Sequence, residues 1–206
     1  MTTIAGMPLR YRGQSDLDDY PTPPWVTRSL FRYAVQGAWE SYSCLEPACG
    51  RGHMADVLRE YFSSVVASDV ADYGYGEVRD FLAEPAQQSD WVVTNPPYVL
   101  AERFAARAIA TARVGCALLT RTVFVEGVGR YERLLRDDPP TLVAQFVRRV
   151  ALVRGELSRR GPSGVSYAWL VWERSRRGRG TSMTWIPPEC REELERSGDY
   201  DSRVPA

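Results

Sequence analysis

Short apolar runs alternate along most of this chain with segments in which apolar residues recur every three or four positions. Apolar runs bounded by turn residues are typical of buried β-strands, whereas the three-to-four spacing is typical of helices that pack on one side. The runs predict strands at residues 43–48, 65–70, 77–82, 91–94, 114–122, 142–153 and 165–173. The spacing predicts helices at residues 25–39, 53–62, 101–112 and 129–136.

This alternation predicts the fold class. Strands separated by single helices form a mostly parallel sheet that helices cover on both faces. We therefore expect an α/β, Rossmann-like fold with a mostly parallel seven-stranded sheet. Ligands of such sheets bind at the carboxyl ends of the strands, so the loops that follow the strands are the places to search for chemistry.

The chain divides into three parts by composition. Residues 1–20 are polar and are interpreted as a flexible leader, and the prolines that begin at Pro21 stop any earlier helix. Residues 21–175 carry the alternating pattern and are expected to form one folded domain. Residues 176–206 are Arg/Gly-rich at first and charged at the end, and are interpreted as a C-terminal tail that packs only in part.

Composition excludes several classes of protein. Hydrophobic residues make up 44% of the 206 residues, which is the globular range and argues against a disordered chain. The 26 basic residues, all of them arginine, balance 26 acidic ones, so net charge gives no overall attraction to nucleic acid. No apolar run approaches the roughly 18 residues of a membrane helix, and the N-terminus lacks an apolar stretch of the signal-peptide type. We expect a cytoplasmic protein that is not bound to a membrane.

Cysteine and histidine are too sparse to suggest a metal centre. The four cysteines form no CxxC pair, and His53 is the single histidine. A zinc site needs a cluster of such ligands, so we expect no metal and read the cysteines as reduced and buried.

A glycine loop, Glu46-Pro47-Ala48-Cys49-Gly50-Arg51-Gly52, follows the first predicted strand and opens a helix. Its glycines allow a ligand to approach the backbone closely, although a structural turn would also explain them. The carboxylate of Glu46 would repel a pyrophosphate and would suit an ammonium group. Asp69 ends the next strand, where such folds place a ribose-binding acid, and Asp80-Phe81 follows a third strand, but helix caps or turns would also explain these acids.

A second loop, Asn95-Pro96-Pro97-Tyr98, directly follows an apolar strand. The side-chain oxygen of Asn95 and the carbonyl oxygen of Pro96 can each accept a hydrogen bond from a planar amine. The two prolines fix the direction of the backbone, and Tyr98 offers a flat surface for a base, worth roughly 1–3 kcal/mol of stacking. Positioning by such groups needs no strong base. The loop therefore predicts a site for an exocyclic amine, with a strand-ending turn as the alternative.

Together these motifs, in this order and spacing, resemble the S-adenosylmethionine-dependent amino-methyltransferases. The best match is to the DNA adenine-N6 group, in its compact phage- or prophage-encoded form, over residues 19–173. Tyr20-Pro21-Thr22-Pro23-Pro24-Trp25 resembles the N-terminal cofactor motif of that group, while the segments at residues 120–124 and 168–172 resemble its later strands. Larger members carry a separate target-recognition domain, for which this chain leaves no room.

The resemblance implies roles for individual residues. It places the methionine end of S-adenosylmethionine against the glycine loop, the ribose against Asp69, and the adenine ring against Asp80 and Phe81. The implied cofactor site consists of Thr22, Pro23, Glu46, Pro47, Ala48, Gly50, Gly52, Asp69, Val70, Asp80, Phe81 and Asn95. The implied catalytic loop, which binds the target base, consists of Asn95, Pro96, Pro97 and Tyr98.

Basic residues are concentrated between Arg148 and Arg179, where arginines outnumber acids nine to two. Within this segment Arg154, Arg159 and Arg160 lie in a predicted flexible loop, where they would suit contacts with DNA phosphates. A solvated surface loop is the alternative interpretation.

We expect an enzyme that flips an adenine out of DNA and methylates its N6 amine. Methylation of RNA guanine N2 or of a protein glutamine N5 remains open, because a glutamine amide presents the same planar NH2 group. Two further alternatives are an inactive module of the same fold that only binds DNA or a partner, and a nicotinamide-dependent enzyme. The target site, the oligomeric state and a cognate restriction enzyme are not predicted.

Overall fold

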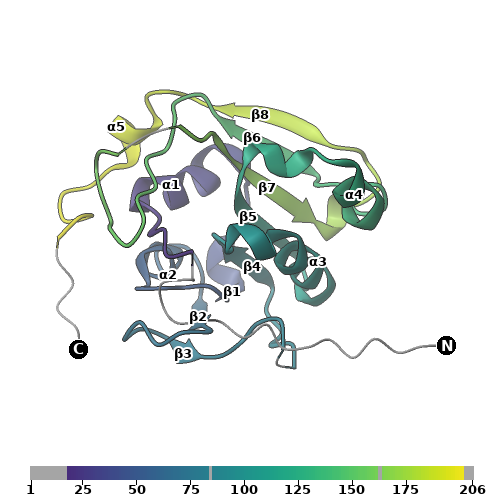
Figure 1. The fold of residues 1–206 in the computed structure, drawn as a ribbon, viewed down its shortest axis with the longest axis horizontal. Coiled ribbons are helices and arrows are strands. Elements are labelled where there is room, and N and C mark those ends of the chain that lie inside the picture. Colours follow the sequence, from purple (N-terminus) through teal and green to yellow (C-terminus); the bar gives the residue numbers. More distant parts are fainter. Residues whose placement is uncertain (1–17, 84, 162–163, 202–206) are drawn as a thin grey trace.

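The computed structural model describes residues 18–83, 85–161 and 164–201. In this part of the chain eight strands form a single sheet in the order β3-β2-β1-β4-β5-β7-β6-β8 (Figure 1). The strands are β1 (Ser43–Glu46), β2 (Ser64–Asp69), β3 (Glu77–Val78), β4 (Trp91–Thr94), β5 (Gly115–Arg121), β6 (Leu142–Phe146), β7 (Tyr167–Glu173) and β8 (Ser182–Ile186). Strand β7 runs antiparallel to its neighbours β5 and β6, and the other described strand pairs are parallel.

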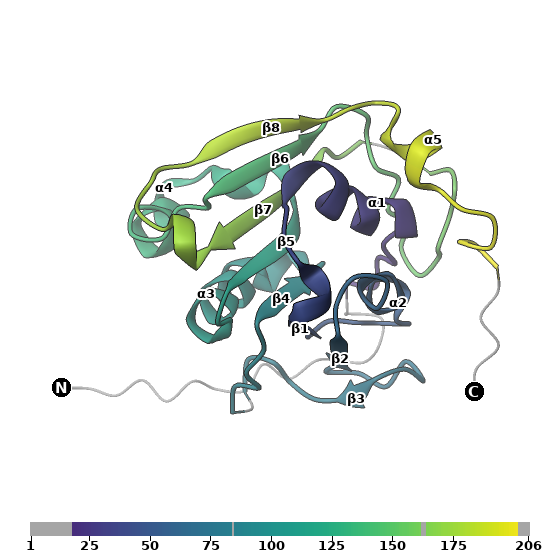
Figure 2. The same ribbon diagram turned by 180° about the vertical axis from the view of Figure 1, so that it is seen from behind.

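The helices lie on both faces of this sheet, as predicted (Figures 1 and 2). They are α1 (Pro24–Ser29), α2 (His53–Leu58), α3 (Ala101–Thr111), α4 (Val128–Arg130) and α5 (Cys190–Leu194). Residues of α1, α2 and α5 belong to the core on one face, whereas α3 and the turn after α4 contribute to the core on the other. Coverage on both faces explains why the central strands consist of continuous apolar runs.

The strand number differs from the predicted seven because β8 lies inside the segment that was interpreted as a tail. Residues 182–186 pair in parallel with β6, and α5 follows directly. The strand is short and directly follows Arg/Gly-rich sequence, and three of its five side chains are exposed. Strand β6 ends at Phe146 rather than at residue 153, and β3 has only two residues.

The first helix also differs from its prediction. It begins at Pro24, whose missing N–H costs nothing at a helix start. After Ser29 it widens into a π-helical turn, Leu30–Ala34, in which the N–H of Val35 bonds to the carbonyl oxygen of Leu30 (3.0 Å). The helix therefore stops five residues earlier than residue 39.

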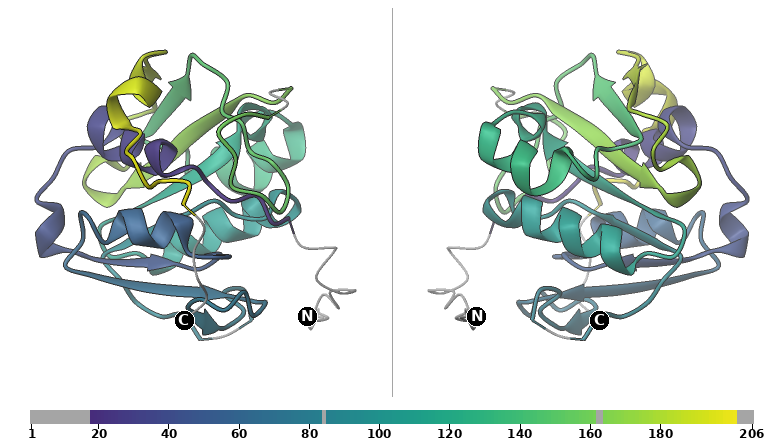
Figure 3. Two further views of the ribbon diagram at one scale, coloured as in Figure 1. Left: turned by 90° about the vertical axis from the view of Figure 1, so that its left-hand side faces the viewer. Right: turned by 90° about the vertical axis from the view of Figure 1, so that its right-hand side faces the viewer.

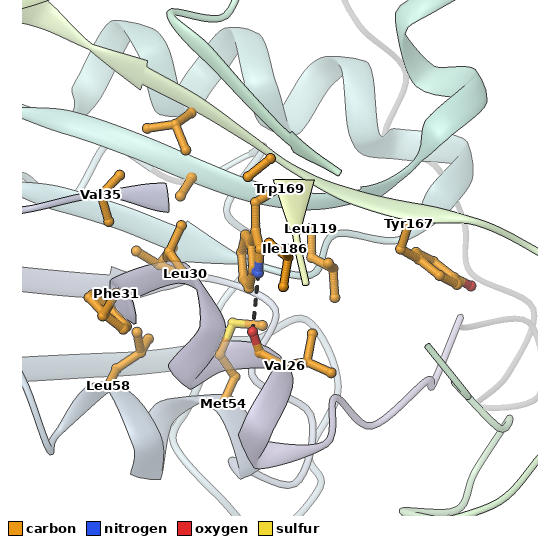
Figure 4. Close-up of a cluster of buried hydrophobic side chains, with 14 of the residues drawn as sticks. Val26, Leu30, Phe31, Val35, Met54, Leu58, Leu119, Tyr167, Trp169 and Ile186 are labelled. Carbon is orange, nitrogen blue, oxygen red and sulfur yellow. Dashed lines mark hydrogen bonds between the residues drawn. The ribbon is translucent and has the colours of Figure 1, made fainter. Parts of the chain in front are cut away.

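Trp169 lies at the centre of the core between the sheet and α1 (Figure 4). The indole is fully buried, and its N–H donates to the backbone oxygen of Val26 (3.1 Å). Leu30 and Met54 pack around it from α1 and α2. Because a buried indole N–H requires an acceptor, this bond fixes α1 against β7 as well as burying apolar surface.

The C-terminal segment is held against α1 by a buried arginine. The guanidinium of Arg28 donates to both carboxylate oxygens of Glu60 and of Asp199, and to the backbone oxygen of Leu194. The side chain of Arg28 is 5% exposed and that of Asp199 is 6% exposed. Accordingly α5 and the residues after it lie beside α1 (Figure 3).

Candidate active site at the carboxyl ends of the strands

A cavity opens at the edge of the sheet where β1, β2 and β4 end. It holds about 750 Å³ of space between the atoms, counted together with the open solvent at its mouth. Most residues of the predicted cofactor site line it: Thr22, Glu46, Pro47, Ala48, Gly50, Asp69, Val70, Asp80, Phe81 and Asn95. The strands bring these residues together because parallel strands present their carboxyl ends at one edge.

Two predicted cofactor residues are not in the wall of this cavity. Gly52 adopts φ +80°, and a Cβ there would lie 2.2 Å from the ring of Tyr75, so its bare α-carbon makes room for that ring. Pro23 accepts a hydrogen bond from the N–H of Val26 (2.9 Å) and begins α1. Gly52 therefore shapes the glycine loop, and Pro23 fixes the end of the segment before α1; both of these segments line the cavity.

Gly50 and Asp69 form the floor of the glycine loop. Gly50 has φ +49°, and no atom lies within 4 Å of the position that a Cβ would occupy. One oxygen of Asp69 accepts the N–H of Gly50 (2.9 Å), and the other accepts the N–H of Ala71 (3.1 Å). Burial raises the pKa of Asp69 above its usual value, although these backbone hydrogen bonds oppose the shift. The carboxylate thus fixes the loop and still lines the cavity.

The cavity is acidic. Glu46 is 2% exposed at the end of β1, and Asp19 joins Asp69 in the wall. Burial, together with the negative charges of Asp69 and Asp19, raises the pKa of Tyr73 to about 12. A cavity of this kind favours a ligand that carries positive charge and offers N–H and O–H donors.

An aromatic pair closes one end of the cavity. The rings of Phe81 and Phe104 lie 5.2 Å apart at a tilt of 45°, and Phe81 is 5% exposed. Asp80 accepts the N–H of Leu82 (2.8 Å), which corresponds to the turn role weighed as the alternative, and its side chain also reaches the wall. Phe104 comes from α3 and was not predicted as a site residue, because its spacing in the sequence indicates only the buried side of a helix.

The amide of Asn95 has a defined orientation. Its Nδ2 donates to the backbone oxygen of Tyr20 and to Oγ1 of Thr22, each at 3.1 Å. Its Oδ1 is buried and has no hydrogen-bond partner among the described residues. Since both amide hydrogens are engaged, Oδ1 can only accept, and it is the atom that an incoming N–H group would meet.

The segment before α1 was not predicted to reach the catalytic loop. Asp18 accepts the N–H of Tyr98 (2.9 Å), and Tyr20 packs against the ring of Tyr98 with centroids 5.2 Å apart. We call residues 18–22 the strap. It lines the cavity and holds both ends of the loop that begins at Asn95.

A second hollow lies on the other side of the loop at residues 95–98. It holds about 650 Å³ of space, open solvent included, and Pro96 and Tyr98 line it, whereas Asn95 and Pro97 line the first cavity. The guanidinium of Arg121 lies 4.0 Å from the centre of the Tyr98 ring. The loop therefore separates an acidic cavity from a hollow that arginines and apolar side chains border.

The hydroxyl of Tyr98 bonds to that of Tyr167 (2.8 Å), and burial raises the pKa of Tyr98 above its usual value. Arg121 covers one face of the ring, so a base could stack there only after this arginine has moved. The ring is thus placed at the second hollow, and its stacking role remains a prediction.

The three arginines of the predicted DNA-binding loop, Arg154, Arg159 and Arg160, do not face the same part of the molecule. Gly155 donates its N–H to the backbone oxygen of Asp19 (2.8 Å), which holds the exposed Arg154 near the strap. Arg159 turns toward the C-terminal segment, where it lies 3.4 Å from a carboxylate oxygen of Glu195. Arg160 is exposed. Contacts of these residues with DNA remain predictions.

Within the described residues there is no group of three or more metal-binding side chains. The four cysteines are free and buried, as expected. None of the helices in this part of the chain combines the length and the apolar character that a membrane crossing requires.

Comparisons with known proteins place the fold. No protein-family model matches the chain, and a search of curated proteins finds no match either. Among solved structures, the chain is similar to a modification subunit from Vibrio vulnificus YJ016 assigned to a type I restriction enzyme, with 14% identity and a TM-score of 0.62. A type I restriction-modification methyltransferase subunit from Streptococcus thermophilus follows, with 12% identity and a TM-score of 0.58.

These alignments cover 86% and 85% of this chain but only 49% and 47% of the two subunits, so the chain spans about half their length. A protein from Pyrococcus horikoshii assigned as an RNA methyltransferase has 16% identity and a TM-score of 0.56 over 79% of this chain and 88% of its own length. The chain therefore shares the mixed α/β fold of solved methyltransferases.

Proposed function

We propose that this protein transfers a methyl group from S-adenosylmethionine to the N6 amine of an adenine flipped out of DNA. The observation that carries the proposal is the buried Oδ1 of Asn95, which has no hydrogen-bond partner among the described residues and belongs to a residue that lines the acidic cavity. The next loop residue, Pro96, lines the second hollow. An acceptor fixed in this way suits an exocyclic amine, which offers two N–H donors.

The residues of the first cavity fit S-adenosylmethionine. Its ammonium group suits the buried carboxylate of Glu46, its ribose hydroxyls suit Asp69, and its adenine ring suits the aromatic pair at Phe81. The absence of a Cβ at Gly50 leaves the backbone open to the ligand. A dinucleotide fits less well, because its pyrophosphate would meet the acidic wall.

In this proposal the chain positions the target amine and supplies no strong acid or base. S-adenosylmethionine, when bound, supplies a methyl group activated by the positive charge on its sulfur. Asn95 Oδ1 and the Pro96 carbonyl oxygen accept the two N–H bonds of the target amine, which directs the nitrogen lone pair toward the first cavity. An amine that gains a methyl group must lose one proton, which would pass to water because neither Asn95 nor Pro96 offers a base.

RNA is the second candidate substrate. The similar protein assigned as an RNA methyltransferase is covered over 88% of its length, against 49% for the modification subunit. A site that accepts an exocyclic amine does not by itself distinguish a base in DNA from one in RNA.

The test is methyl transfer from labelled S-adenosylmethionine to adenine-containing DNA, to RNA and to total protein. Label in the N6 amine of DNA adenine supports the proposal, while label confined to RNA or protein contradicts its substrate. Under single turnover with saturating cofactor, we expect Asn95→Ala to slow transfer by at least about a hundredfold, the scale for one positioned polar group at a reacting centre. Transfer at the wild-type rate would show that this loop is not catalytic.

A further inference from the structure

In the part of the chain that the structure describes, the sheet ends at β8, which lies along the outside of the molecule with no further strand paired to it (Figures 1 and 2). The N–H of Ser182 bonds to the Thr141 oxygen, and the Ile186 oxygen accepts the N–H of Val147, so these residues of β8 face β6. Because backbone groups alternate in direction along a strand, those of Met183 and Trp185 point away from the sheet. An open edge of this kind is a template for pairing with another strand.

The side chains at this edge are unusually apolar. Met183 is 57% exposed and Trp185 is 60% exposed, and both lie on the same face of β8 because they are two residues apart. Just after the neighbouring β6, Val147 is 55% exposed. Exposed edges commonly carry charges that prevent pairing, but the two outward positions of β8 carry none.

The strand is complementary to itself in the antiparallel direction. If Thr184 lies on a two-fold axis, Met183 of one copy stands opposite Trp185 of the other, and both residues have outward backbone groups. Such a pair exchanges two N–H···O bonds, and the axis creates it twice. Pro187 has no N–H and ends the ladder just beyond the strand.

Opposite charges flank the two ends of the strand. Arg179 precedes the strand and Glu189 follows it, each five positions from Thr184. Both are exposed, and within the described part of the chain neither forms an ion pair. Antiparallel pairing about Thr184 would bring the arginine end of one copy against the acidic end of the other, twice.

We propose that β8 is the docking surface for a second copy of this chain, which joins through antiparallel β8–β8 pairing about Thr184 and extends the sheet across the dimer. The outward backbone groups supply the hydrogen bonds, Met183 and Trp185 supply the apolar contact, and the end charges select the antiparallel register. Parallel pairing would place Arg179 beside Arg179 and is disfavoured.

The first test is sedimentation equilibrium of the full chain from about 1 to 100 µM, a range that detects dissociation constants in the micromolar region. We expect a monomer–dimer equilibrium in the wild type. Met183→Pro removes an outward N–H without removing a bond to β6, so it should weaken dimerisation at least tenfold while the melting temperature stays close to that of the wild type. A wild type that remains monomeric throughout this range would overturn the proposal.

Charge exchange provides a second test that does not depend on the proline variant folding. Arg179→Glu and Glu189→Arg should each weaken the dimer severalfold, whereas the double variant and an equimolar mixture of the two single variants should restore it. Arg103→Glu, at an exposed position on α3, is the matched control and should leave the dissociation constant unchanged. If neither single variant weakens the dimer, or if the mixture does not restore it, pairing through β8 is refuted.

Discussion

Thr22→Val tests whether the strap orients the amide of Asn95 for the proposed methyl transfer. Thr22 is 4% exposed, and its Oγ1 accepts one of the two hydrogens of Asn95 Nδ2, while the Tyr20 oxygen accepts the other. Valine has nearly the shape of threonine but cannot accept a hydrogen bond. The substitution therefore removes one of the two bonds that direct Asn95 Oδ1 toward the amine.

The size of the effect follows from that single bond. A hydrogen bond between uncharged groups contributes about 1 kcal/mol net, which corresponds to about a fivefold change in rate. The other Nδ2 hydrogen keeps its bond to Tyr20, and water in the cavity that Thr22 lines can accept the freed hydrogen, so the loss should stay near this value. We therefore expect single-turnover methyl transfer to slow about fivefold in Thr22→Val.

Thr22 also lines the cofactor cavity, so the assay must separate positioning from cofactor binding. Transfer is measured at saturating S-adenosylmethionine in the wild type and in the Asn95→Ala background, which forms a double-mutant cycle. With the amide absent, Thr22→Val should have no further effect. The control is Thr27→Val, because the Thr27 hydroxyl is also buried but has no hydrogen-bond partner among the described residues. An equal loss in both backgrounds would refute the orienting role.

Three other predictions concern the cofactor, the pH response and the nucleic acid. Asp69→Asn should weaken S-adenosylmethionine binding by about 2 kcal/mol, the scale for a hydrogen bond to a charged group, and unchanged affinity in calorimetry would contradict the ribose assignment. Asp90 pairs with Arg113, whose side chain is 52% exposed, and accepts hydrogen bonds from Ser43. Because solvent screens this pair, Asp90→Asn should lower the free energy of unfolding by only about 1 kcal/mol at pH 7, and not at pH 2. Hydrogen bonds from that arginine and from a serine lower the pKa of Asp90 to about 2, so its contribution is present above about pH 4 and is lost as the pH falls toward 2 in denaturant titrations. Replacing Arg154, Arg159 and Arg160 by serine should weaken binding to all DNA sequences alike and flatten its salt dependence, whereas loss for one sequence alone would indicate base readout.

The strands that lie at the centre of the sheet were predictable because both of their faces are buried. Residues 91–94 form β4 as predicted, and the loops after β1, β2 and β4 all reach one cavity. Continuous apolar runs identify such strands, and parallel pairing then dictates that the residues after them meet. The local pattern therefore carried most of the information about where a ligand could bind.

The contacts of the strap and the place of β8 could not be predicted from local pattern. The bonds from Asn95 to the strap join residues 73 and 75 positions apart, and nothing in the spacing of either segment indicates them. Strand β8 pairs with β6 about forty residues away, and only one of its five side chains is buried. Periodicity reports which side of an element is buried, but not which distant segment buries it.

Arg28 shows how one such contact connects the C-terminal segment to the strap that lines the cavity. In the sequence it is a polar residue on a short helix, yet it bonds to Asp199, 171 positions away, and to Glu60. Arg28 and Asp199 are both buried, and burying two charges is favourable only when each is paired, so loss of either would leave the other uncompensated. The helix that carries Arg28 begins two residues after Thr22. The segment that follows β8 therefore anchors, through this helix, the strap that orients Asn95.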